Sequence, residues 1–240
     1  MMRRVIIACL LAGNAFAQWG EDSRTMARYL FPGGQSAVTA SDAAGLNGIA
    51  GATGWVFSAT SASAATFAAT NLIQTPLTGT LATNESCAIA LWFKTSATAS
   101  NMALAGVNMG SPGTLLSLEL GSGSGIFISC RDSDSTSSDT CSMTNEYRDN
   151  AWHYVTAMYD GNARQLRMYV DGLASSNASV TANSGSANKA WTTGIGIGGL
   201  ARPSAAPLRP YIGSLWGFKI DRYAPSLEDH NADRSKGFPP

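Results

Sequence analysis

Charged residues are scarce in this 240-residue chain, at 13% of the sequence. The 16 basic residues balance the 16 acidic ones, and Lys and Arg form no run or stripe. Nucleic acid and anionic membrane surfaces are therefore poor candidate partners. Lys and Glu are sparse beside abundant Gly, Ser, Thr, Ala and Asn, and this composition argues against long solvent-exposed helices.

Groups that commonly carry catalysis are also few. The chain has only two histidines, His153 and His230. It has no G-x-S-x-G sequence, the turn that presents the nucleophile of many serine hydrolases. A lyase would need a His or Tyr base in a basic, aromatic-lined groove, and these two histidines are the only ones that the sequence offers. We do not expect the protein to be an enzyme.

No apolar run reaches the roughly 20 residues that a membrane-spanning helix needs. The N-terminus instead carries Arg3 and Arg4, the apolar stretch 5–12 and an A-x-A site at 15–17, an order typical of a secretory signal peptide. We expect residues 1–17 to be this signal peptide, with cleavage before Gln18. The mature chain is then secreted to the periplasm or the extracellular space, with no membrane insertion.

Cysteines are few and, after removal of Cys9, odd in number. Cys130 and Cys141 flank a polar loop of ten residues between two expected strands. We predict that they form a disulfide, which export would permit and which would stabilise the fold by roughly 2–3 kcal/mol. Cys87 begins an alternating apolar segment and is interpreted as a buried thiol.

Short segments of strand character, separated by Gly and Pro, fill most of the remaining sequence. Strands are expected at 27–31, 64–67, 88–94, 115–120, 126–130, 194–197 and 214–221. Their number and spacing predict an all-β, two-sheet antiparallel jelly-roll sandwich in a single domain. The one expected helical turn lies at 226–229, with Ser226 as its N-cap.

Residues 150–172, NAWHYVTAMYDGNARQLRMYVDG, are the most explicit part of the sequence. Two alternating strands are joined at Asp160-Gly161-Asn162, where Gly and Asn tolerate the positive φ of a hairpin turn. Asp171-Gly172 ends the second strand. We interpret both aspartates as turn residues and His153 as part of the sandwich, so His153→Ala should lower stability more than ligand affinity.

This hairpin resembles the "WhhVa…yDG…l.lYvDG" pattern of the laminin-G-like jelly roll in the concanavalin A-like lectin/glucanase superfamily, in its secreted bacterial or phage-associated form. Segments 88–94, 195–199 and 213–229 resemble the neighbouring family strands. The resemblance implies a jelly-roll domain over 27–230, preceded by an N-terminal extension at 18–26 and followed by a C-terminal tail at 231–240. It implies little about function, because this fold hosts lectins, adhesion modules, glycanases, lyases and structural domains.

The chain matches the calcium-binding positions of the family only in part. Family members that bind calcium hold it with acidic residues near strand ends, and Asp42 and Asn47 are the candidate ligands for a structural calcium here. The closing strand, however, has Trp216-Gly217 where the family often has an acidic pair. Asp132, Asp134 and Asp139 form a second acidic group. Solvated turns are the alternative interpretation of both groups.

Related glucanases place two carboxylates on one face of a strand, about 5–5.5 Å apart. The E-x-D-x-x-E spacing that achieves this is lacking here, and Glu119 is the only carboxylate inside an expected interior strand. A divergent polysaccharide lyase or glycoside hydrolase is therefore the second alternative function. Release of reducing ends that is lost on Glu119→Gln would favour it.

The leading interpretation is a non-catalytic carbohydrate-binding or adhesion module whose partner is a glycan or polysaccharide. The long insertion GGLARPSAAPLRPY at 198–211 provides its best ligand-binding candidates, because long loops often carry function. They are Trp191, Arg202, Arg209 and Tyr211. A loop that merely covers an edge of the sandwich is the alternative interpretation. The first alternative function is a structural or protein-binding component of a cell surface or virion.

Overall fold

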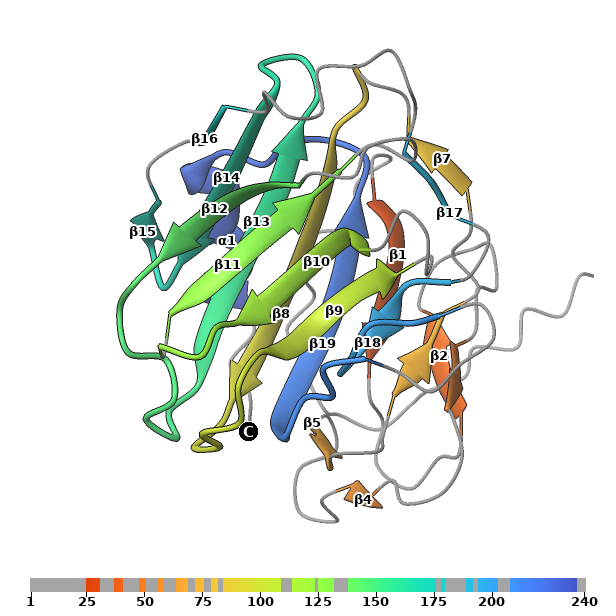
Figure 1. Cartoon of the computed structure of the whole chain (residues 1–240), viewed down its shortest axis with the longest axis vertical. Coiled ribbons are helices and arrows are strands. Elements are labelled where there is room, and N and C mark those ends of the chain that lie inside the picture. Colours follow the sequence, from red (N-terminus) through yellow and green to blue (C-terminus); the bar gives the residue numbers. More distant parts are fainter. Residues whose placement is uncertain are drawn as a thin grey trace, which may run out of the picture.

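The computed structural model describes residues 25–30, 37–40, 48–50, 56–57, 64–68, 72–75, 79–81, 84–108, 114–123, 125–131, 138–175, 178–179, 189–191, 194–202 and 208–236. It is a sandwich of two antiparallel sheets, with α1 (Leu227–Lys236) on the outside of one of them (Figure 1). The predicted jelly-roll fold is confirmed. No helix in the described part of the chain is long and apolar enough to cross a membrane.

The first sheet, sheet A, has the strand order β14–β13–β8–β19–β1, and every pairing in it is antiparallel. Short strands extend its edges, β15 and β16 beside β14, and β4 and β5 beside the first half of β19. The bounds are β1 Thr25–Leu30, β4 Val56–Phe57, β5 Ala64–Phe67, β8 Cys87–Lys94, β13 His153–Asp160, β14 Gln165–Val170, β15 Leu173–Ala174, β16 Ala178–Ser179 and β19 Gly213–Asp221.

The second sheet, sheet B, has the order β12–β11–β10–β9–β18–β6–β3–β2, and the pairing of β1 with β2 joins the two sheets. A separate pair consists of β7 and β17. The bounds are β2 Ala37–Ala40, β3 Gly48–Ala50, β6 Ile73–Gln74, β7 Gly79–Leu81, β9 Met102–Asn108, β10 Thr114–Leu120, β11 Ile126–Cys130, β12 Asp139–Met143, β17 Lys189–Trp191 and β18 Gly196–Ile197.

The core lies between the sheets, and the alternation of each strand decides which side chains enter it. From sheet A it takes Ile89, Leu91 and Phe93 of β8 and the odd-numbered residues 155–159 of β13. Sheet B contributes the even-numbered residues 116–120 of β10 and 126–130 of β11. The outward residues of β8 and β13 form two smaller clusters, one built on Trp92, Tyr154 and Trp216.

A β-bulge at Gly217 marks the middle of β19. The register against β8 shifts between Trp216 and Phe218, and Gly217 has a φ of 51°. On the other edge of β19, β5 pairs with the residues before the bulge and β1 with those after it. The glycine that replaces the family's acidic residue therefore allows one strand to bend between two partners.

The predicted Cys130–Cys141 disulfide is wrong. The structure holds both residues as buried thiols, together with Cys87. The prediction assumed that the two cysteines face one another, but the register pairs Cys130 with Asp139 and Cys141 with Ile128. The thiols therefore lie on a diagonal of the hairpin, and Cys141 Sγ is 3.2 Å from Ser175 Oγ. Burial raises the pKa of the Cys87 thiol to about 12.

The two Asp-Gly steps of the central hairpin do form turns. Asp171 and Gly172, with φ of 52° and 86°, connect β14 to β15 in a two-residue turn. At the other turn Asp160 Oδ1 accepts a hydrogen bond from Ala163 N at 3.0 Å. The positive φ there belongs to Arg164. Gly161 is needed instead for space, since a Cβ would lie 2.4 Å from Glu85 O.

Candidate functional site

The described parts of the insertion expected to carry the ligand, residues 198–202 and 208–211, pack against sheet B. Leu200 and Ala201 are buried, and the segment is held to β9 by backbone hydrogen bonds from Asn108 N to Ala201 O and from Ala103 N to Arg209 O. Leu200 lies so close to Gly106 of β9 that a Cβ there would be 2.7 Å from Leu200 Cδ2. These described residues thus cover an edge of β9, as the alternative interpretation of this loop expects.

Tyr211 is removed from the candidate ligand set by its burial. It is 0% exposed, and its hydroxyl donates to Lys94 O at 2.8 Å. Its ring packs edge-on against Phe67, 6.1 Å away. Burial also raises the pKa of its hydroxyl. A side chain enclosed in this way ties β19 to the end of β8 and cannot stack on a sugar.

Arg209 is exposed, but it serves as the partner of a buried carboxylate. Glu119 of β10 is 0% exposed, and both of its oxygens accept from Arg209 Nη1, at 2.7 and 2.6 Å. Arg209 has a φ of 51°, a conformation costly for a residue other than glycine. The ion pair accounts for both residues structurally, since a buried carboxylate needs a compensating charge.

The other predicted site residues are brought together only in part. Arg202 is half-buried at the end of the segment that covers sheet B. Trp191 pairs through its backbone with Gly79, and its side chain lies outside the described residues. The possible calcium ligands Asp42 and Asn47 also lie outside them. Within the described ranges, no group of three or more His, Cys, Asp and Glu residues could hold a metal ion.

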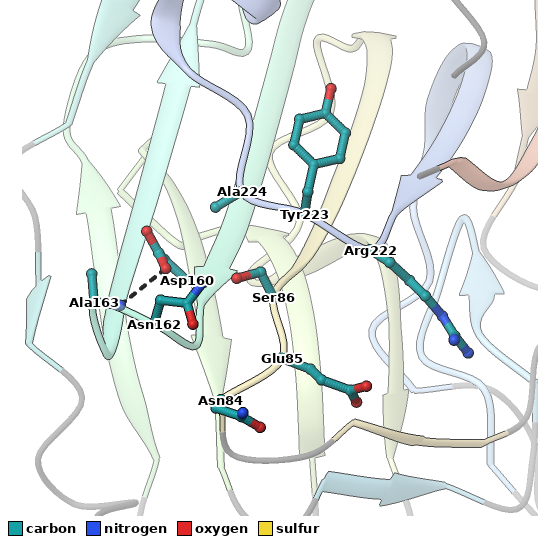
Figure 2. Close-up of a pocket in the computed structure, with 9 residues that line it drawn as sticks. All are labelled: Asn84, Glu85, Ser86, Asp160, Asn162, Ala163, Arg222, Tyr223 and Ala224. Carbon is teal, nitrogen blue, oxygen red and sulfur yellow. Dashed lines mark hydrogen bonds between the residues drawn. The ribbon is translucent and has the colours of Figure 1, made fainter. Parts of the chain in front are cut away.

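A cavity of about 570 Å³ opens at one end of sheet A, where three connections meet (Figure 2). The segment before β8 provides Asn84, Glu85 and Ser86, the β13–β14 turn provides residues 160, 162 and 163, and the link from β19 to α1 provides residues 222–224. These segments meet because β13, β8 and β19 are antiparallel neighbours. The end of β13, the start of β8 and the end of β19 therefore share one edge.

Two of the lining side chains hold the cavity together. Ser86 Oγ accepts from Gly161 N at 3.1 Å, which fastens the β13–β14 turn to the segment before β8. Asp160 accepts from Ala163 N and forms an ion pair with Arg167. The remaining polar side chains reach the surface: Asn84, Glu85, Asn162 and Arg222 are exposed and Tyr223 is half-buried. Sequence reasoning missed all five, because their loops meet only when the strand order is known.

His153, interpreted from the sequence as part of the sandwich, does not line this cavity. Its Nδ1 is 2.7 Å from Asp171 Oδ2 and its Nε2 is 3.0 Å from Asp149 Oδ1. Its ring packs against Phe93 and Tyr147. Burial acts to lower the pKa of His153, but the hydrogen bonds and charges of Asp171 and Asp149 outweigh it and raise the pKa above 6.5.

This raised pKa predicts a pH-dependent contribution of His153 to stability. A group whose pKa is higher in the folded state stabilises the fold fully below its unfolded pKa, about 6.5, and less as pH rises through the folded pKa. His153→Gln should therefore cost more stability at pH 6 than at pH 9, measured by urea unfolding at both values. An equal cost at both pH values would contradict the assigned ion pairs.

Comparison with known proteins gives the family. The family model of the concanavalin A-like lectin/glucanases superfamily matches residues 67–222. No curated protein matches the sequence. Solved structures match at low identity, so the likeness concerns the fold.

Two of the similar structures are binding domains of botulinum neurotoxins. The domain of serotype D, in complex with N-acetylneuraminic acid, is 13% identical with a TM-score of 0.64, over 88% of this chain and 51% of that one. The domain of type DC, in complex with rat synaptotagmin II, is 12% identical with a TM-score of 0.62, over 90% of this chain and 52% of that one. This chain thus matches about half the length of each.

A third similar structure is the CBM40 module of a Ruminococcus gnavus IT-sialidase, which is 16% identical with a TM-score of 0.49, over 65% of this chain and 85% of that one. The residues matched by the family model include the strands from β6 to β19, two walls of the cavity and Arg222 of the third. The chain belongs to the concanavalin A-like lectin/glucanase superfamily, in its laminin-G-like branch.

Proposed function

We propose that this protein is a secreted, non-catalytic carbohydrate-binding module that holds a glycan in the cavity at the end of sheet A. The observation that carries the proposal is the make-up of that cavity. Its size falls in the range of about 300–1,000 Å³ that is usual for small-molecule sites. It has three walls from loops on a rigid sheet, an arrangement that favours binding.

The exposed lining groups suit the hydroxyl groups of a sugar. Asn84 and Asn162 each offer an amide donor and an amide acceptor, Glu85 offers acceptors and Arg222 offers donors. Sugar hydroxyls donate and accept, so they can pair with all of these groups. The half-buried Tyr223 adds an aromatic ring with a polar tip, the type of side chain that packs against a sugar face.

The carboxylates of the described residues favour binding over hydrolysis. Glu119, the acid considered for a glycanase, is fully buried beneath Arg209. In the cavity Asp160 is committed to Arg167 and the turn, which leaves Glu85 as the other lining carboxylate. A glycosidase needs two carboxyl groups on opposite sides of one bond. Secretion is proposed from the signal-peptide pattern of residues 1–17.

The similar structures support this proposal through the fold that they share. One neurotoxin domain is in complex with a sialic acid, which makes glycans the first ligands to test. Another is bound to synaptotagmin II, so a protein partner is the alternative outcome of a binding test. We expect the cavity residues, rather than the 198–211 segment, to decide affinity in this chain.

Exchange of Asn162 for alanine tests the site against a matched control. Asn162→Ala should weaken binding to the glycans selected on an array by about 5–10-fold, the loss expected for one or two hydrogen bonds. Asn145→Ala, at another exposed asparagine shortly after β12, should leave affinity unchanged. Both are measured by isothermal titration calorimetry. Equal affinities for the two variants would move the glycan site away from this cavity.

A further inference from the structure

Polar side chains rather than an apolar stripe fasten α1 to the outer face of sheet A. The buried residues of this ten-residue helix are His230 and Asp233. Of its apolar side chains, Leu227 joins Ala224 against the cluster of Ala88, Met158 and Tyr169. Docking of the helix therefore depends strongly on what its two buried polar residues contact.

His230 has partners for both ring nitrogens and two aromatic neighbours. Its Nδ1 is 2.9 Å from Thr156 Oγ1 on β13, and its Nε2 accepts from Gly172 N at 3.1 Å. The ring stacks on Tyr154 with centroids 5.0 Å apart and lies 5.7 Å from Tyr169. Because Nε2 accepts a hydrogen bond, this arrangement requires the neutral imidazole with its proton on Nδ1.

The charged groups around His230 come from each element that packs against it. Asp233 and Arg234 share its helix, Asp171 lies in the β14–β15 turn, and β19 contributes Lys219 and Asp221. Burial lowers the pKa of His230 most, the charge of Arg234 lowers it further and Asp171 partly opposes them, which leaves a pKa of about 4. Tyr154 and Tyr169 are the titratable groups that the ring touches.

The same helix fixes one wall of the cavity. β19 ends at Asp221 and α1 begins at Leu227, so the connection between them is residues 222–226. Three of these five residues, 222–224, line the cavity (Figure 2). The capping box of Ser226 and Asp229 joins the connection firmly to the helix. The wall is therefore held at one end by β19 and at the other by docked α1.

We propose that His230 is a positioning residue for the glycan cavity: neutral His230 keeps α1 docked and the wall at 222–224 in place, and protonation of His230 releases both. The proposal rests on the proposed function for its biological meaning, but the coupling of helix and wall is a property of the chain alone. Glycan affinity would then fall in acid through a residue that does not line the cavity.

Proton linkage gives the size of the effect. A histidine with a pKa near 6.5 when released and about 4 when docked binds its proton mainly in the released state. The docking equilibrium constant should therefore fall by about 100-fold between pH 6.5 and pH 4. In the docked state a proton on Nε2 would face the N–H of Gly172, so two donors would oppose each other.

Hydrogen–deuterium exchange of the full chain, read by mass spectrometry and corrected for the intrinsic pH dependence, tests the coupling without any ligand. Between pH 7 and pH 4.5 the protection of residues 222–236 should fall relative to that of β10 and β11. Arg234→Gln removes a positive charge that lowers the pKa of docked His230. The docked and released pKa values of His230 then differ less, so the loss of protection should occur at lower pH. His230→Gln should remove the pH-dependent loss.

Three results would overturn the proposal: unchanged protection of 222–236 across the pH range, loss in α1 without loss at 222–224, or loss at unchanged pH in Arg234→Gln. If His230→Gln does not fold, the wild-type and Arg234→Gln profiles still decide, because Arg234 is a half-buried surface residue. Failure of the proposed function has a different signature, since a chain that binds no glycan can still show the coupled loss of helix and wall.

Discussion

Lys219→Met is expected to lower the free energy of unfolding by about 3–5 kcal/mol at pH 7, the cost typical of leaving buried charges without their partner. Lys219 lies on β19 with a side chain 3% exposed, 3.1 Å from Asp221 and in an ion pair with Asp233 of α1. Removal of the ammonium leaves two carboxylates enclosed between the sheet and the helix. Urea unfolding followed by circular dichroism measures the loss.

Lys236→Met is the matched control for this change. Lys236 approaches the same Asp233 at 3.7 Å, but its side chain is 42% exposed. A surface ion pair of this kind contributes at most about 1 kcal/mol. If Lys219→Met cost no more than Lys236→Met, α1 would not be anchored by the Lys219 network, and the account of its docking would fail.

Arg209→Ala should have the second large effect, a loss of about 3 kcal/mol in unfolding free energy with no loss of glycan affinity. Its guanidinium is the partner of Glu119, which has no exposure of its own. Arg222→Ala should give the opposite result, little change in stability and weaker glycan binding, because Arg222 is exposed and lines the cavity. The two variants thus distinguish an arginine that stabilises the fold from one that binds the ligand.

Adding Glu119→Leu to Arg209→Ala provides the control for the ion pair. The double variant should recover much of the lost stability, because the buried charge disappears together with its partner. Thermal unfolding of the two single variants and the double variant gives the coupling free energy. A double variant that is less stable than either single variant would show that the two residues act independently.

Much of the sandwich could be predicted from the sequence because its central strands alternate strictly. The bounds of β5 and β11 are those predicted, and β8 and β19 begin one residue early. The expected N-cap at Ser226 is confirmed by its hydrogen bond from Asp229 N, although the helix continues to Lys236, six residues beyond the predicted domain end. The local sequence pattern determines these features, so they can be predicted from the sequence.

Other elements could not be predicted because contacts between distant parts of the chain determine their residues. β9, MALAGVN, is buried at every residue, so it lacks the alternation of apolar and polar residues that marks a half-exposed strand. β12, DTCSM, is largely polar because it is an edge strand. The wrong disulfide prediction has the same cause, because a register shift of two residues decides whether cysteines on neighbouring strands face each other. His230 carried no signal in sequence, because its partners come from three other elements.

The cavity is the clearest case of a site that sequence patterns do not display. Its lining residues are 84–86, 160, 162, 163 and 222–224, and no motif marks any of them as a ligand site. The strand order β13–β8–β19 is what brings them together. The strand order could have been assigned from the family resemblance, and it would have grouped the three connections. Arg222 and Tyr223 would then have replaced Arg209 and Tyr211 as candidate ligand-binding residues.

One measurement tests the central claim most directly. The ¹⁵N-labelled protein is screened on an array of neutral and acidic glycans, with calcium and with a chelator, and the strongest binding glycan is titrated while amide chemical shifts are followed. We predict shifts concentrated at residues 84–86, 160–163 and 222–224. Shifts confined to the 198–211 segment, or no binding to any glycan in either buffer, would contradict a carbohydrate site in this cavity.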